Sequence, residues 1–219
     1  MFIEGELERI DEVYRRGLRH LQLFHEADDR VSPLGDVNTR APHLGGLTAF
    51  GAEVIRACNR LGVVVDLAHA SHETVIGALA ASAQPLVVSH TSLDSWGSES
   101  KMYSMMKPRL ITKAQAKAVA DGGGVIGVWT HLTRSRADYV GSIRAMVDAI
   151  GIDHVGIGTD TDLLAARGGT NDRWPDEHGF FAGVVDEMGR QGFGAEDIAK
   201  VGGGNYVRVF EQVTSPART

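Results

Sequence analysis

Short apolar runs rich in β-branched residues alternate with longer amphipathic stretches along the whole 219-residue chain. The runs have the length of buried strands, and the stretches between them have the length and periodicity of helices. Strands that are separated by helices pair in parallel, because the helix returns the chain to the same end of the sheet. Six strands are predicted, at residues 2–4, 20–24, 63–67, 86–89, 125–129 and 154–158. The pattern therefore predicts an α/β fold built from successive βα units.

Helices are predicted between these strands, and several of them carry terminal signals. Ser71 and Thr112 precede two of the helices as candidate N-caps, and Gly62 follows another where a left-handed cap favours glycine. The predicted helices span residues 7–17, 48–61, 71–81, 112–120, 136–150 and 180–191. No linker or low-complexity tract separates the units, so we expect residues 1–219 to form one domain.

Composition narrows the class of function. A hydrophobic fraction of 43% is enough for a proper core, which argues against disorder. With 22 basic and 28 acidic residues the net charge is -6, so no basic face is expected to attract nucleic acid. No apolar run reaches membrane-spanning length and the N-terminus is acidic, so we expect no membrane segment and a cytoplasmic location. The single cysteine, Cys58, is interpreted as a buried thiol.

Two long segments interrupt the alternation of strands and helices. Residues 26–46 and 91–111 each follow a predicted strand and carry His, Asp, Arg and Gly in place of core residues. In a barrel of parallel strands, the loops at the carboxyl ends of the strands build the active site. We therefore expect substrate contacts in these two segments.

Acid/base or metal-binding side chains stand at the ends of five predicted strands. Glu4, His25, His69, His90 and Asp160 would all project at one rim of a parallel barrel. Imidazole and carboxylate groups are the usual ligands of zinc where thiolates are absent. A cation held there would lower the pKa of a bound water and polarise a substrate carbonyl, which predicts hydrolysis.

Each of these residues also has a structural interpretation. A single histidine at a strand end more often packs or makes a hydrogen bond than binds metal. Two such histidines one βα repeat apart, as here, make metal binding about as plausible as a structural role. Glu4 could be a solvated carboxylate and Asp160 could cap the next loop. Arg109, just before a predicted helix, could grip a substrate carboxylate with both guanidinium nitrogens or could be solvated.

The sequences around His69 and His90, NRLGVVVDLAHAS and PLVVSHTS, resemble the two histidine signatures of the renal (membrane) dipeptidase family, peptidase family M19. Three further stretches agree in order and spacing: IEG at 3–5, GGLTAFG at 45–51, and the closing pair DHVGIGTDTD at 153–162 and GGGNYVRVFEQV at 202–213. Five collinear motifs over nearly the whole chain are far more specific than any one of them. The resemblance implies a TIM-like (β/α)8 barrel and a zinc-dependent dipeptidase that hydrolyses small dipeptides.

The resemblance also implies a role for each candidate residue. Glu4 matches a glutamate that bridges two Zn²⁺ ions, and His69 and His90 match the histidines of one of those ions. A metal-bound hydroxide would attack the peptide carbonyl of the substrate.

Three more residues match the parts of the family's site that contact substrate. His25 matches a histidine that contacts substrate and stabilises the tetrahedral intermediate. Arg109 matches the arginine that holds the substrate's terminal carboxylate. Asp160 matches the aspartate placed for proton transfer or amine contact.

The chain departs from the family at its start. Family members begin with a strand bearing a His-x-Asp pair, which binds the second metal, and a further βα unit; neither is present here. We therefore expect about six of eight βα units and only one metal half-site. Open sheet edges at 2–4 and 154–158 would favour a homo-oligomer. The alternatives are a catalytically impaired barrel remnant with a single weak metal site, and another amidohydrolase-like metallohydrolase.

Overall fold

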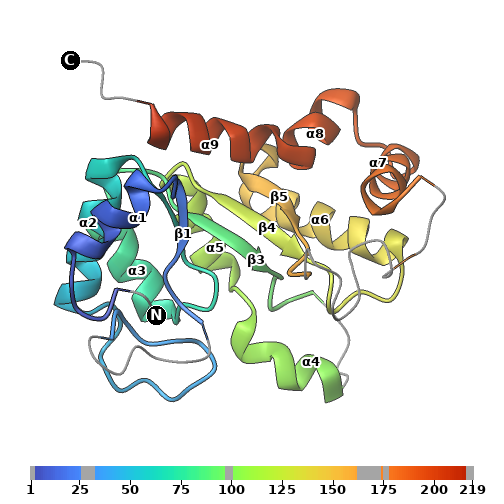
Figure 1. Ribbon diagram of the computed structural model, residues 1–219. Coiled ribbons are helices and arrows are strands. Elements are labelled where there is room, and N and C mark those ends of the chain that lie inside the picture. The colour runs from blue at the N-terminus through green and yellow to red at the C-terminus, as the bar shows by residue number, and fades with distance from the viewer. Residues whose placement is uncertain (1–2, 26–32, 97–100, 162–173, 175–177, 216–219) are drawn as a thin grey trace.

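The computed structural model describes residues 3–25, 33–96, 101–161, 174 and 178–215. Its five strands form one sheet in chain order, and each neighbouring pair is parallel (Figure 1). The strands are β1 (His20–Gln22), β2 (Val64–Asp66), β3 (Val87–Thr91), β4 (Val125–Trp129) and β5 (Val155–Gly158). Consecutive parallel strands joined by helices are the arrangement of a TIM-like barrel, which confirms the predicted fold class.

The helices follow the predicted intervals closely where their terminal signals are strong. Thr112 and Gln115 form a reciprocal capping box at the start of α5, Ser71 caps α3, and Gly62 ends α2 with a φ of 73°. The helices are α1 (Glu8–Arg15), α2 (Ala49–Leu61), α3 (His72–Ala81), α4 (Lys101–Met106), α5 (Lys113–Asp121), α6 (Arg136–Ile150), α7 (Phe180–Arg190), α8 (Ala195–Ala199) and α9 (Asn205–Thr214). Short turns of other helix types lie at η1 (Lys107–Arg109), η2 (Ile152–His154) and η4 (Lys200–Gly204). Helices α4, α8 and α9 were not among the predicted ones.

The two faces of the sheet are covered differently. Val65, Val88 and Ile126 belong to the large core that also contains the buried residues of α2, α3, α5 and α6. Their strand neighbours Val64 and Val87 point the other way, as alternation along a strand requires, and pack with Val125 against α9. Helix α9 therefore lies across the opposite side of the sheet from the main helical layer (Figure 1).

The prediction of a strand at residues 2–4 is wrong for Ile3 and Glu4, the two residues of this range that the structure describes. Ile3 has no regular structure and its carbonyl accepts from the Glu6 N–H, which closes a turn. Glu4 and Gly5 both have left-handed backbones, with φ of 46° and 82°. Such a pair bends the chain away from the extended course that a strand needs. Ile3 is fully buried all the same, so the apolar signal was that of a core residue in a turn.

The edges of the described sheet are β1 and β5. Of these two strands, only β5 was expected to be an edge, because the sequence analysis placed the other edge strand at residues 2–4. Self-association through these edges stays a prediction.

Cys58 is buried in α2, as interpreted, and burial raises the pKa of its thiol to about 12. Among the described helices, none has the length and apolar character needed to span a membrane.

Candidate metal and substrate site

Four of the expected site residues meet at the carboxyl ends of the strands. His25 lies three residues after β1, His69 follows β2 in a turn, His90 lies within β3, and Asp160 follows β5. Because all five strands run in parallel, these positions share one rim of the sheet. The sequence pattern placed them there, and the structure brings their side chains together.

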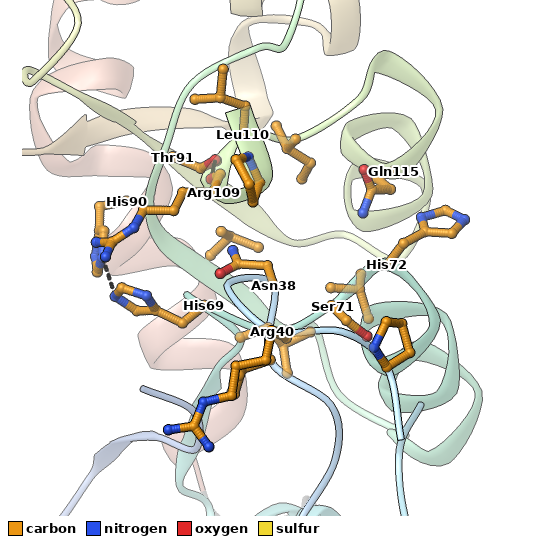
Figure 2. A pocket seen from close by; sticks show the side chains of 18 residues that line it. Asn38, Arg40, His69, Ser71, His72, His90, Thr91, Arg109, Leu110 and Gln115 are labelled. Carbon is orange, nitrogen blue, oxygen red and sulfur yellow. Dashed lines mark hydrogen bonds between the residues drawn. The ribbon is translucent and has the colours of Figure 1, made fainter. Parts of the chain in front are cut away.

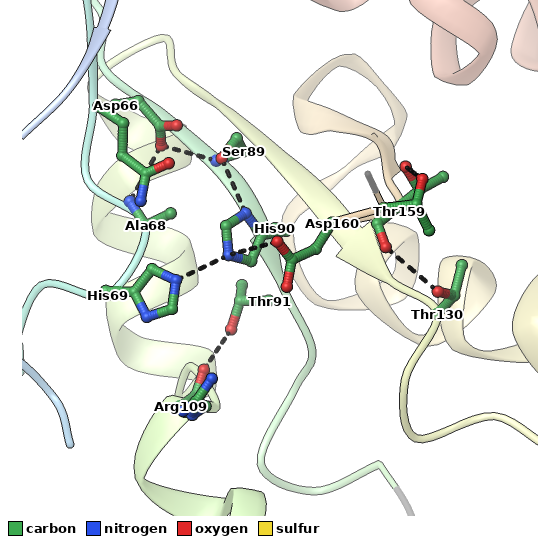
Figure 3. Close-up of polar contacts among 12 residues, drawn as sticks. Asp66, Ala68, His69, Ser89, His90, Thr91, Arg109, Thr130, Thr159 and Asp160 are labelled. Atoms are coloured by element: carbon green, nitrogen blue, oxygen red, sulfur yellow. Dashed lines mark hydrogen bonds and ion pairs between the residues drawn. The ribbon is translucent and has the colours of Figure 1, made fainter. Parts of the chain in front are cut away.

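The rings of His69 and His90 meet in a T-shaped arrangement at this rim. Their Nε2 atoms are 3.1 Å apart, and the Asp160 Oδ1 lies 3.8 Å from the same His90 nitrogen (Figure 3). The His25 ring lies beside His69, with 4.8 Å between ring centroids. The two imidazole nitrogens are thus in hydrogen-bonding contact, with the Asp160 carboxylate near one of them and the His25 ring beside the other imidazole.

Three of the candidate residues carry backbone strain. Among the described residues, the non-glycine residues with positive φ are Glu4 at 46°, His69 at 69° and Asp160 at 49°. A left-handed backbone costs a non-glycine residue on the order of 1–3 kcal/mol and persists where the surroundings enforce it, often at functional sites. All three were selected from the sequence as functional candidates, on grounds unrelated to backbone geometry.

His90 is aimed by an irregularity in β3. The register between β3 and β4 shifts between Val88 and Thr91, which is the effect of a β-bulge. Gly127 and Gly158 lie against this segment, and a Cβ on either would stand 2.0 or 2.1 Å from the Ser89 carbonyl oxygen. Glycine is therefore needed at both positions for the neighbouring strands to approach the bulge.

Burial and neighbouring charges keep His69 neutral. Loss of water contact is the largest cause, and the nearby His90, His25 and Arg109 add to it, so that the pKa of His69 falls to about 4. Asp160 acts in the opposite direction. At neutral pH the His69 ring is thus an uncharged imidazole, the form that binds metal.

A pocket of about 280 Å³ opens beside the two histidines (Figure 2). Arg40, Arg109 and Gln115 are among its polar lining residues. The Arg109 carbonyl oxygen accepts a hydrogen bond from the Thr91 hydroxyl at 2.9 Å, which ties η1 to the end of β3. The predicted carboxylate-binding arginine therefore lies on the wall of a pocket that also contains His69 and His90.

Part of the predicted substrate loop at 26–46 forms another wall, and Asp36 organises it. Its carboxylate accepts the backbone N–H groups of His43, Leu44 and Gly46 at 2.8–3.2 Å. Burial raises the pKa of this carboxyl, but the three backbone donors outweigh it and leave the pKa below its usual value. Residues 26–32 of this loop and 97–100 of the second predicted loop lie outside the described residues.

Glu4 is not brought into the cluster. Its carboxylate is 2.5 Å from the Arg9 guanidinium, on the surface. Within the part of the chain that the structure describes, no group of three or more His, Cys, Asp or Glu side chains is close enough to hold a metal ion. The described residues thus offer two convergent imidazoles in place of the expected set of Glu4, His69 and His90.

Asp66 was missed by the sequence interpretation. It is 2% exposed and interrupts the apolar run Val-Val-Val-Asp-Leu-Ala of the second strand. A charge at a buried strand position is costly unless partners surround it, and that cost is the signal that could have revealed it. Its partners include Ser89, the residue before His90.

The fold and the rim together define a class: an α/β protein of the TIM-barrel type in which histidines and a carboxylate gather at the carboxyl ends of parallel strands. The family described as membrane dipeptidase, peptidase family M19, matches residues 2–219. The chain belongs to this family.

A curated relative carries a dipeptidase name, and solved structures share the fold. Dipeptidase verJ of Clonostachys rogersoniana is 29% identical over 212 residues, which cover 92% of this chain and 50% of that protein. An amidohydrolase from Pseudomonas aeruginosa superposes with a TM-score of 0.80 at 22% identity, over 98% of this chain and 70% of that one. A metallopeptidase from Rhodobacter sphaeroides, liganded with a phosphinate mimic of the dipeptide L-Ala-D-Ala, gives 0.72 at 20% identity, over 94% and 59%. The chain spans about half the length of the curated relatives it matches.

Proposed function

We propose that this chain carries the dipeptide-binding pocket and one metal half-site of a metal-dependent dipeptidase. The observation that carries the proposal is the convergence of the His69 and His90 Nε2 atoms, 3.1 Å apart, beside a pocket lined by Arg109. Family membership supports hydrolysis of a peptide bond as the reaction.

The two imidazoles fit zinc as two of its ligands. Nitrogens bound to one tetrahedral zinc at about 2.0–2.1 Å lie about 3.3 Å from each other, close to the observed separation. His69 is neutral at physiological pH, so its ring keeps one unprotonated nitrogen that can bind metal. A divalent cation held there supplies a Lewis acid for the substrate carbonyl and lowers the pKa of water.

Glu4 enters the proposal as a further ligand that must first leave Arg9. Both partners of that ion pair are partly exposed, with side-chain exposures of 52% and 35%. Exposed ion pairs are worth about 0–1 kcal/mol, so exchange of Arg9 for a dication costs little. The second half-site of the family has no counterpart among the described residues.

The other three candidate residues act directly on the dipeptide. Arg109 grips the terminal carboxylate, because a guanidinium can donate two parallel hydrogen bonds to it. His25, next to His69, donates to the carbonyl oxygen as negative charge develops there. Asp160 takes a proton from the attacking water and passes it to the leaving amine.

A pocket of about 280 Å³ lies at the small end of ligand sites, which suits a dipeptide better than a longer peptide. The Rhodobacter sphaeroides relative was solved with a mimic of L-Ala-D-Ala, so this dipeptide is the first substrate to test.

A second candidate is a catalytically impaired remnant that binds one metal weakly. The absence of a three-ligand cluster among the described residues favours it. In that case the chain would act, if at all, by binding.

The test combines metal binding with turnover. The metal-free chain is titrated with Zn²⁺ by calorimetry, and hydrolysis of L-Ala-D-Ala, L-Ala-L-Ala and N-acetyl-alanine is then measured. We expect tight Zn²⁺ binding that His69→Gln abolishes and that His154→Gln, a histidine bonded to the Gly124 carbonyl, leaves unchanged. Turnover of the dipeptides supports the first candidate, and metal binding without turnover supports the second. Cleavage of the acylated amino acid alone would move the assignment to another amidohydrolase.

A further inference from the structure

The first turn of α5 presents a hydrogen-bond donor to the pocket beside the candidate site. Gln115 is the third residue of this helix and is only 8% exposed, yet its side chain lines the pocket. Figure 2 shows its amide end turned towards the interior of the pocket, on the side where His72 also lies. His69 and His90 lie at the other side of the same pocket in this view.

The capping box fixes which end of this amide faces the pocket. The Thr112 N–H donates to the Gln115 Oε1 at 2.9 Å, and the Thr112 hydroxyl accepts from the Gln115 N–H at 3.2 Å. A backbone N–H is only a donor, so the side-chain atom that receives it must be the carbonyl oxygen, and the amide cannot be reversed. The Nε2 group with its two hydrogens is therefore left for the pocket. No residue that the structure describes accepts a hydrogen bond from it.

Apolar side chains make up much of the remaining wall. Val75, Val88 and Ile111 line the pocket, and each is at most 5% exposed. No described lining residue is Asp or Glu, whereas Arg40 and Arg109 both belong to the lining. The pocket therefore suits an aliphatic stem that ends in an acceptor oxygen, and its arginines favour a negatively charged one.

We propose that Gln115 is a specificity-determining residue that selects dipeptides whose C-terminal side chain ends in an acceptor oxygen, as in glutamate or glutamine. The inference rests on the proposed function, because it takes Arg109 as the residue that holds the terminal carboxylate. That carboxylate and the C-terminal side chain leave the same Cα, and Arg109, Ile111 and Gln115 line one pocket. The side chain thus runs from Arg109 along Ile111, and the Gln115 Nε2 group donates to its oxygen.

The selectivity comes from the shielding of this donor. A side chain that ends in a thioether or methyl group displaces water from the Gln115 amide and offers it no acceptor, which leaves the donor unsatisfied. A carboxylate or carboxamide of the same length replaces the lost bond. Sites that hydrogen-bond a ligand group reject analogues without that group more strongly than apolar pockets reject one methylene.

The test measures binding, so it does not depend on turnover. Three derivatives of the test dipeptide, L-Ala-D-Glu, L-Ala-D-Gln and L-Ala-D-Met, are titrated into the metal-free chain at about pH 8, where the ligand carboxylates are ionised. Methionine has nearly the shape of glutamine but no acceptor oxygen. Labelling with ¹⁵N-glutamine follows the side-chain amide signal of Gln115, which is assigned by its loss in Gln115→Glu.

We expect the glutamate and glutamine dipeptides to bind about 10-fold more tightly than the methionine dipeptide. These two alone should move the Gln115 amide protons downfield, as a new hydrogen bond does. Equal affinity for the three dipeptides, no binding of any of them, or an unmoved amide signal would overturn the proposal.

A change of charge at the same position sharpens the test. Gln115→Glu keeps the helix cap, because glutamate at this position also accepts from the Thr112 N–H. It should weaken binding of L-Ala-D-Glu by at least about 10-fold through repulsion and leave L-Ala-D-Met unchanged. Binding of L-Ala-D-Gln should fall less, since the ligand amide can itself donate to the new carboxylate. Gln212→Glu makes the same change at an exposed position of α9 and should alter none of the three affinities.

The outcomes separate this inference from the proposed function. An unchanged ratio of glutamate to glutamine affinity in Gln115→Glu would refute the role of Gln115, even if L-Ala-D-Ala is hydrolysed. Absence of Zn²⁺ binding, with the preference among the three dipeptides intact, would count against the proposed metal site alone. If Gln115→Glu does not fold, the wild-type affinities and the amide signal decide the inference.

Discussion

Replacing Gly127 by alanine should damage the fold at the point where His90 is aimed. The added methyl group would stand 2.0 Å from the Ser89 carbonyl oxygen, 2.8 Å from its carbon and 3.0 Å from the Gly158 Cα. All three contacts are with backbone atoms, which cannot rotate away as a side chain can. Strands β3 and β4 would have to separate by more than 1 Å, since ordinary carbon contacts begin near 3.4 Å.

The cost follows from two effects. Overpacking of a tight interior typically costs about 1–3 kcal/mol. Each ladder hydrogen bond that is lost as the strands part adds about 1 kcal/mol. We therefore expect Gly127→Ala to lower the free energy of unfolding by about 2–4 kcal/mol. For a chain of this size that corresponds to roughly 4–16 °C in Tm.

Gly189→Ala is the matched control. Gly189 lies in α7, and no atom stands within 4 Å of the Cβ that the change would add. Because alanine loses less backbone entropy than glycine in a helix, this variant should be stabilised by about 0.5–1 kcal/mol. Urea denaturation of both variants, with midpoint and slope fitted separately, gives the comparison. If Gly127→Ala were as stable as wild type, strands β3 and β4 would not pack tightly at Gly127. The argument that glycine is needed beside the β3 bulge would then fail.

Three further expectations concern the capping of α5, the pocket loop and pH. Thr112→Ala removes one half of the capping box with Gln115 and should cost about 1 kcal/mol in urea denaturation, whereas Thr112→Ser should cost little. Asp36→Asn leaves backbone donors of the loop unsatisfied, so we expect a loss of about 1–3 kcal/mol and faster proteolysis of the loop; equal proteolysis rates would contradict this role. The pKa of His69 is lowered from 6.5 to about 4, so between these values the unfolded chain binds the extra proton and stability falls as the pH is lowered. The loss in the metal-free chain should reach roughly 1–3 kcal/mol near pH 4 after allowance for solvent screening, and His69→Gln should remove that part of the urea-midpoint shift.

The sequence predicted the fold class because its signals are local. Alternating strand and helix patterns, with caps such as Thr112 and Gly62, depend on neighbouring residues only. The same local logic failed at Ile3, where burial in a turn gives the same apolar signal as burial in a strand. Helix α9 was missed because its residues were interpreted only as a family motif.

The candidate site was predicted in part. Parallel strands carry their carboxyl ends to one rim, so His25, His69, His90 and Asp160 could be grouped from their sequence positions alone. The contact of Glu4 with Arg9 could not be foreseen, because it depends on how the turn before α1 folds back.

By itself the sequence determined which residues stand at the strand ends and which chemical groups they bring, since strand periodicity and residue type are properties of the chain. Only the tertiary structure decided that the His69 and His90 Nε2 atoms face each other at 3.1 Å, and that Asp66 and Ser89 stand behind His90. The physical reason is that these contacts join different strands. Their geometry is set by strand register, the β3 bulge and the close approach at Gly127 and Gly158, none of which is encoded in any one segment.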